Sequence, residues 1–232
     1  MFDEKEKLFW VKVSLFYFFS IALIGVGIRY SFLSGFFPIE YKNLLHTHSH
    51  IGFLGWIYPM LFLLITNSFF TKEQIKKSKY KLQFYITQVL ILLMLFSFLY
   101  QGYGLFSIIF SSLFQLMTYW FLFTALKNLS QNEKTISSKF TSIALISLFI
   151  SSLGTWALPI IKVNKFDYFY EMAIYFYLHF QYNGWLSFSL LGLFFKNIEN
   201  KEINYNLKEA RVINTRIYLD GSGERINREL NH

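Results

Sequence analysis

The sequence predicts an all-α protein, a polytopic membrane bundle of six transmembrane helices. Two observations carry this prediction: the composition and the spacing of the lysines. Of the 232 residues, 54% are hydrophobic, 22% are aromatic and 16% are charged. A soluble domain of this length does not need so much apolar surface, and long runs without charge are typical of membrane spans. The lipid bilayer is therefore the first expected partner.

Six segments are long and apolar enough to be the predicted helices. A helix needs about 20 apolar residues to cross the hydrocarbon core. The segments that meet this need are 13–33, 44–69, 82–100, 105–126, 140–161 and 172–195. The third and fourth are joined only by the short stretch 101–104, so they are expected to form an antiparallel hairpin.

The lysines predict the orientation of the bundle. They gather before the first span and in the loops after the second and fourth spans, at Lys5, Lys7, Lys12, Lys72, Lys76, Lys77, Lys79, Lys81, Lys127, Lys134 and Lys139. The positive-inside rule then places both termini in the cytoplasm, as expected of a multi-pass protein of a bacterial inner (plasma) membrane. Lysines facing this surface also explain the net charge of +8 better than nucleic acid would.

Three regions follow from this organisation: a cytoplasmic N-terminus (1–12), a six-helix transmembrane domain (13–195) and a polar cytoplasmic tail (196–232). The tail has no Phe and is rich in arginine. It is compatible with a disordered, solvated segment and equally with a frameshifted or truncated reading frame. No cleavable signal peptide and no internal repeat are evident. The absence of cysteine excludes disulfides, thiolate metal sites and iron–sulfur clusters.

Three of the five histidines, His46, His48 and His50, lie at the outer end of the second predicted span. Ionisable groups at membrane depth usually serve a function, and imidazole is a common ligand of haem and transition metals. On a helix His48 shares one stripe with Gly52, Gly55 and Pro59, which leaves room for a flat ligand or for close helix packing. His46 and His50 share a different stripe. The three imidazoles therefore cannot all bind one ion from a regular helix, and an interfacial cap is the alternative to a cofactor or metal.

The other membrane histidine is His179, in the outer third of the sixth predicted span. Its stripe continues through Asn183 and Ser187, and a polar stripe is expected to face the bundle interior. Its depth matches that of the first cluster, which favours a shared site. A plain interhelical hydrogen-bonded pair of His179 and Asn183 is the alternative.

At these residues the chain resembles the catalytic subunit of the haem–copper oxidase and nitric oxide reductase superfamily, in particular its N-terminal six-helix half. In that family a His of the second span ligates the low-spin haem. Thr47-His48, followed by Pro59 after eleven residues, fits the oxidases, and Gly55-Trp56 fits the reductases. In the sixth span, His179 with Gly184 and Trp185 resembles the first ligand of copper or non-haem iron, with Asn183 in place of an acid.

The resemblance implies a haem-binding respiratory oxidoreductase that passes electrons to oxygen or nitric oxide. His48 would hold the haem, of unknown type, with Gly52 and Gly55 beside it. His179 would hold copper or non-haem iron, with His46 and His50 as further possible ligands and Asn183 as their neighbour. The family has twelve spans, and its remaining ligands come from spans seven to ten. The chain alone is therefore expected to be inactive, and a second respiratory subunit or a homo-oligomer would complete it.

Two other functions remain open from the sequence. A transporter could use the histidines to bind zinc or protons at the entrance of its transport path, but it would need acidic partners inside the membrane. Glu40, Asp167 and Glu171 lie instead at outer loops or edges. A non-catalytic membrane or assembly protein is the third possibility. The gas substrate, the electron donor and the oligomeric state do not follow from the sequence.

Overall fold

The computed structural model describes residues 4–35 and 38–202, and every element in these ranges is helical. The order is α1 (Glu4–Ser34), α2 (Tyr41–His50), η1 (Ile51–Ile57), α3 (Tyr58–Phe69), α4 (Lys72–Lys77), α5 (Tyr80–Gln101), α6 (Leu105–Gln131), α7 (Ile136–Val163), α8 (Asp167–His179) and η2 (Phe180–Leu186). The segments η1 and η2 are π-helical. Residues 187–202 are again α-helical. An all-α fold is thereby confirmed.

The chain divides into two compact units, residues 1–193 and Phe194–His232. All the labelled helices belong to the first unit. In the second unit, residues 194–202 are helical. The prediction of a disordered tail concerns mainly residues 203–232, which lie outside the described part of the chain.

Five helices in the described part of the chain are long and apolar enough to cross a membrane, which indicates a multi-pass membrane protein. They are Glu4–Ser34, Tyr41–Phe69, Tyr80–Gln101, Leu105–Gln131 and Ile136–Val163. The second of these runs without a break through α2, η1 and α3. The sixth predicted segment, 172–195, is helical but is not among the five, because His179, Gln181 and Asn183 interrupt its apolar run.

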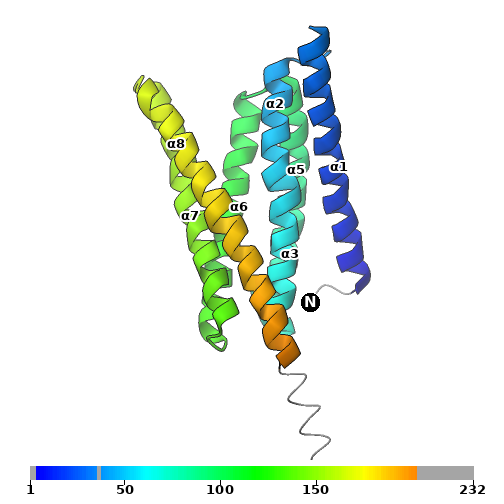
Figure 1. The fold of residues 1–232 in the computed structure, drawn as a ribbon, viewed down its shortest axis with the longest axis vertical. Helices are drawn as coiled ribbons and strands as arrows, with labels where there is room; N and C mark the ends of the chain where they lie inside the picture. The colour runs from blue at the N-terminus through cyan, green and yellow to red at the C-terminus, as the bar shows by residue number, and fades with distance from the viewer. Residues whose placement is uncertain (1–3, 36–37, 203–232) are drawn as a thin grey trace, which may run out of the picture. The chain divides into compact units, whose positions relative to one another are not determined.

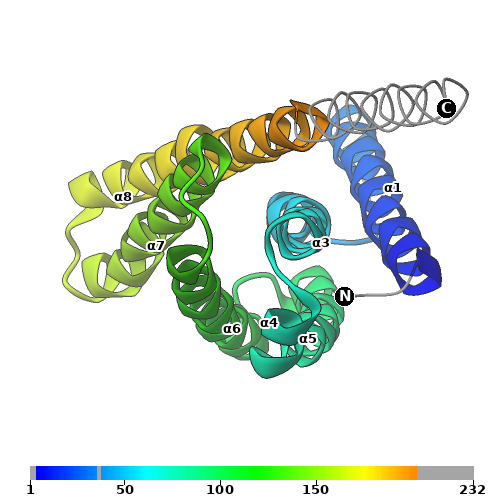
Figure 2. The same cartoon turned by 90° about the horizontal axis from the view of Figure 1, so that it is seen from below.

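Neighbouring helices of the first unit pack in chain order. The predicted hairpin is confirmed, since α5 ends at Gln101, α6 begins at Leu105 and the two helices pack together (Figure 1). Gly102 makes this turn at a φ of +58°. Figure 2 shows the continuation of this order, with α6 beside α7 and α7 beside α8.

The core between the helices is aromatic, as the high Phe content requires. Phe62 of α3 packs on Phe121 of α6, with 4.2 Å between the ring centroids. Phe70 stacks on Tyr80 at 5.2 Å. These side chains have at most 7% of their surface exposed, so they join α3, α5 and α6 into one packed block. The block holds α3, which is continuous with the segment that carries the histidine cluster.

The lysine-rich loop after α3 is built by local hydrogen bonds. Thr71 and Gln74 form a reciprocal capping box at the start of α4. Asn132, after α6, donates to the Phe69 carbonyl oxygen at 2.8 Å and accepts from Gln74 at 2.8 Å. The loop that is predicted to face the cytoplasm is thus tied to the ends of both α3 and α6.

Candidate cofactor site

His48 faces α1. Its Nδ1 lies 3.1 Å from the carbonyl oxygen of Ile21, and a carbonyl oxygen only accepts hydrogen bonds. Nδ1 therefore carries the proton and donates it, and Nε2 keeps a free lone pair. Gly25 makes this approach possible, because a Cβ there would lie 3.2 Å from His48 Cε1. The hydrogen bond orients the ring as in metal-binding histidines, where one nitrogen is anchored and the other binds.

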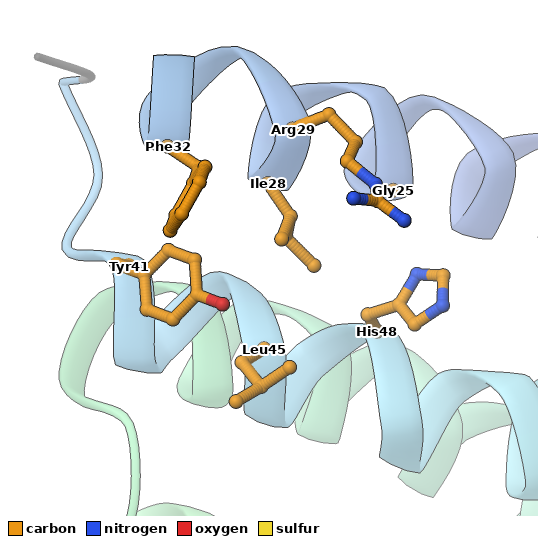
Figure 3. Close-up of a pocket in the computed structure, with 7 residues that line it drawn as sticks. All are labelled: Gly25, Ile28, Arg29, Phe32, Tyr41, Leu45 and His48. Carbon is orange, nitrogen blue, oxygen red and sulfur yellow. The ribbon is translucent and has the colours of Figure 1, made fainter. Parts of the chain in front are cut away.

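A pocket of about 440 Å³ lies between α1 and α2, beside His48. It is lined by Gly25, Ile28, Arg29, Phe32, Tyr41, Leu45 and His48. Figure 3 shows the Arg29 guanidinium and the His48 imidazole turned toward the same space, with apolar side chains around them. Its size is that of a small-molecule site. One exposed guanidinium, one imidazole and apolar walls suit an amphiphile with an anionic group.

The predicted stripe below His48 divides into two parts. A Cβ on Gly52 would meet nothing within 4 Å, so the space beside this position is open. A Cβ on Gly55 would lie 3.3 Å from Ile91 and 3.5 Å from Tyr17, so Gly55 serves close helix packing. Pro59 is buried in the first turn of α3. Gly55 therefore fits the close-packing interpretation, and the ligand interpretation stays a prediction.

His46 and His50 lie on the other side of α2, as the helical spacing predicts. His50 Nε2 is 2.7 Å from the hydroxyl of Tyr103, and the His50 ring stacks on Phe98 at 4.3 Å. The His46 ring meets Tyr103 edge-on at 4.4 Å. Tyr103, in the turn between α5 and α6, thus contacts both imidazoles, whereas His48 contacts α1.

Tyr103, in the turn between α5 and α6, is the contact of both imidazoles. Burial, with a smaller contribution from the neighbouring Tyr170 phenol, raises the pKa of Tyr103 to about 12. About half of its surface, 54%, nevertheless remains accessible. At neutral pH the phenol keeps its proton and is able to donate it to His50 Nε2. Sequence reasoning did not identify Tyr103, because its partners are about 50 residues away in the chain.

His179 is the last residue of α8 and is exposed. The amide nitrogen of Asn183 lies 3.3 Å from His179 Nδ1, which gives the local polar pair that the sequence allowed. The stripe of His179, Asn183 and Ser187 was expected to face the bundle interior, but the structure leaves it exposed. Small residues decide this rotation: a Cβ on Gly184 would collide with Ser147 of α7, so the glycine face is the one that packs.

One feature of both histidine segments was missed by sequence reasoning. The π-helical segment η1 begins immediately after His50, and η2 begins immediately after His179. The sequence does contain the signal, a His followed after four residues by Gly-Trp, at His50-x4-Gly55-Trp56 and again at His179-x4-Gly184-Trp185. Isolated π-helical turns are rare and frequent at functional sites.

A group of three or more His, Cys, Asp or Glu side chains able to hold a metal ion does not occur among residues 4–35 and 38–202. Nothing matches this chain among protein-family models, curated proteins or solved structures.

Proposed function

We propose that this chain is a six-span membrane protein that binds haem through histidines at the outer end of the bundle. Its function would resemble that of the catalytic subunit of respiratory haem–copper oxidases and nitric oxide reductases. The sixth span would be the helix of α8, η2 and residues 187–195. Both termini would lie in the cytoplasm, by the lysine asymmetry.

Charge balance is the observation that carries this proposal. Between residues 13 and 195 the only carboxylates are Glu40, Glu73, Glu133, Asp167 and Glu171, all in loops or near helix ends. A bare divalent ion among neutral imidazoles would keep its full charge in a medium of low dielectric constant, which is costly. Ferrous haem brings the compensating charge with its own porphyrin. The same argument counts against an ion transporter.

The pocket between α1 and α2 supports the chemistry of such a group. His48, the ligand that the resemblance implies, has its Nδ1 anchored and its Nε2 free. Arg29 is the cation that would pair with a haem carboxylate, and Phe32, Ile28 and Leu45 offer apolar contact. When bound, haem would supply one-electron transfer, and the protein would tune it by axial ligation and burial.

Absorption of the purified full chain, produced with ample haem, tests the proposal. We expect a Soret band that disappears in the triple variant His46→Ala, His48→Ala and His50→Ala. Ser49→Ala, a change in the same turn, is the matched control and should keep the band. A wild-type chain without haem, or a triple variant with the full band, would contradict the proposal. Zinc or copper in place of haem would favour a metal transporter.

We also propose that the chain by itself does not reduce oxygen or nitric oxide. After the second span it contains only two further histidines, His179 and His232, whereas a haem–metal pair needs several more nitrogen ligands. A copper or non-haem iron at His179 would need ligands from another subunit or from a second copy. Gas consumption by the chain purified alone would overturn this statement.

A further inference from the structure

We propose that His46, His50 and Tyr103 together bind one divalent metal ion of borderline softness, such as Zn²⁺. This site goes beyond the proposed haem function. It shares no side chain with the pocket of His48 and Arg29, so each site is able to be filled while the other is occupied. Imidazole nitrogens with one anionic oxygen suit Zn²⁺ or Cu²⁺, whereas Mg²⁺ and Ca²⁺ prefer sites made of oxygen alone.

The helix α2 presents two imidazoles on one face. His46 and His50 are four residues apart within its regular part, so their side chains lie one turn apart on the same side. Two histidines at this spacing on a helix are able to bind the same zinc ion. The π-helical segment η1 begins only at Ile51, so it leaves this spacing unchanged. Two of the three ligands therefore come from the local geometry of α2.

The third ligand comes from the turn between α5 and α6. The hydroxyl oxygen of Tyr103 lies 2.7 Å from His50 Nε2. The ring of Tyr103 also meets the ring of His46 edge-on, with 4.4 Å between the centroids. One phenol thus contacts both imidazoles, which a helix pair with a single chance hydrogen bond would not require.

Asn43 holds this turn in place on α2. Its side-chain amide donates to the carbonyl oxygen of Leu99 at 3.4 Å. It also occupies the space that a Cβ on Gly102 would need. Asn43 stands three residues before His46, so the same face of α2 positions the turn and offers the imidazoles. Figure 1 shows the turn at the end of the bundle where α2 begins.

A metal ion needs only a small movement to enter between these groups. Zn²⁺ binds imidazole nitrogen and anionic oxygen at about 2.0–2.2 Å, so two such atoms of a tetrahedral site stand about 3.4 Å apart. His50 Nε2 and the Tyr103 oxygen are 2.7 Å apart and need to separate by about 0.7 Å. The phenol gives its proton to water on binding, and the phenolate oxygen and Nε2 then each donate a lone pair to the ion.

Charge and solvent make this place better suited to an ion than the apolar part of the bundle. A phenolate neutralises one of the two charges of the ion. Tyr103 keeps 54% of its surface accessible, so water screens the remaining charge. The neighbouring cation is Lys42, which acts electrostatically on His46, but it is exposed and its flexible stem lets the ammonium turn toward water.

Zinc titration of the purified full chain, without an affinity tag and with excess Mg²⁺ present, tests the site. We expect one tightly bound Zn²⁺ per chain and a loss of affinity of about tenfold or more in each of His46→Ala, His50→Ala and Tyr103→Phe. His48→Ala and Ser49→Ala are the matched controls and should bind zinc as the wild type does. A wild type that binds no zinc, unchanged affinity in any of the three ligand variants, or loss of zinc in His48→Ala would overturn the proposal.

Tyr103→His protects this test from variants that fold poorly. It offers an imidazole at the same position and should bind zinc at least as tightly as the wild type. If it binds no more tightly than Tyr103→Phe, residue 103 is not a ligand and the proposal is wrong. Zinc should also give the near-ultraviolet difference spectrum of a phenolate in the wild type and not in Tyr103→Phe; zinc binding without this spectrum would exclude the phenolate.

The Soret band of the same samples separates this proposal from the haem function. A wild type with the Soret band but no zinc binding would refute the metal site alone. A wild type that binds zinc through His46, His50 and Tyr103 but has no Soret band would refute the haem function and leave the metal site supported.

Discussion

Replacement of Gly184 by Ala tests the packing that turns the polar stripe of His179 outward. A Cβ at this position would collide with the Cβ of Ser147 and would lie 2.8 Å from its Oγ. Such overpacking costs about 1–3 kcal/mol, and the gain of alanine over glycine in a helix returns about 0.5–1 kcal/mol. We therefore expect a net loss of about 1–2 kcal/mol in the free energy of unfolding.

Gly52→Ala is the matched control, because a Cβ there would meet nothing within 4 Å. It should be neutral or stabilise by about 0.5–1 kcal/mol. Reversible unfolding by SDS in mixed micelles, followed by circular dichroism, measures both variants. Ser147→Gly should relieve the collision, so the cycle with Gly184→Ala should show a coupling of about 1 kcal/mol or more. Equal stabilities of Gly184→Ala and Gly52→Ala, or a cycle without coupling, would refute the packing argument.

Three further predictions concern other parts of the chain. Gln88 is 6% exposed and neither polar atom of its side chain has a hydrogen-bond partner, so Gln88→Leu should raise the free energy of unfolding by about 1–3 kcal/mol in the same SDS assay. In this cysteine-free chain, Lys77→Cys should react with an impermeant maleimide only in opened cells, and labelling in intact cells would reverse the topology. Burial raises the pKa of the Tyr103 phenol to about 12, above its ordinary value of 10.0. The stability that the protonated phenol contributes is therefore fully present below pH 10 and is lost as the pH rises toward 12. The free energy of unfolding should fall less over this interval in Tyr103→Phe.

The apolar runs and the helical period predicted much of what the structure shows. Five of the six predicted segments are long apolar helices, and the hairpin turn lies at Gly102 as expected. The separation of His48 from His46 and His50 also followed from spacing alone. These features depend on the length of an apolar run or on residues within one turn, so neighbouring residues suffice to determine them.

The rotation of each helix about its axis required the tertiary structure. The polar stripe of His179 was expected to be interior, yet Gly184 packs on Ser147 and turns that stripe outward. The helical period also does not name the helix that His48 meets: Gly25, on another helix, admits its ring against α1. Such close approaches depend on pairs of residues that are distant in the chain. The hydrophobic period of a single helix holds no information about such pairs.

The sequence by itself determined an all-α membrane chain, its apolar helices and the clustering of three histidines in one of them. It also contained the His-x4-Gly-Trp motif twice, but the motif by itself does not show the backbone that accompanies it. In the structure both copies carry a π-helical segment, and Phe53 meets Tyr182 at equivalent positions. Only the tertiary structure decided which side each imidazole faces, because steric contact between helices, and not the apolar period, sets the rotation and phase of each helix.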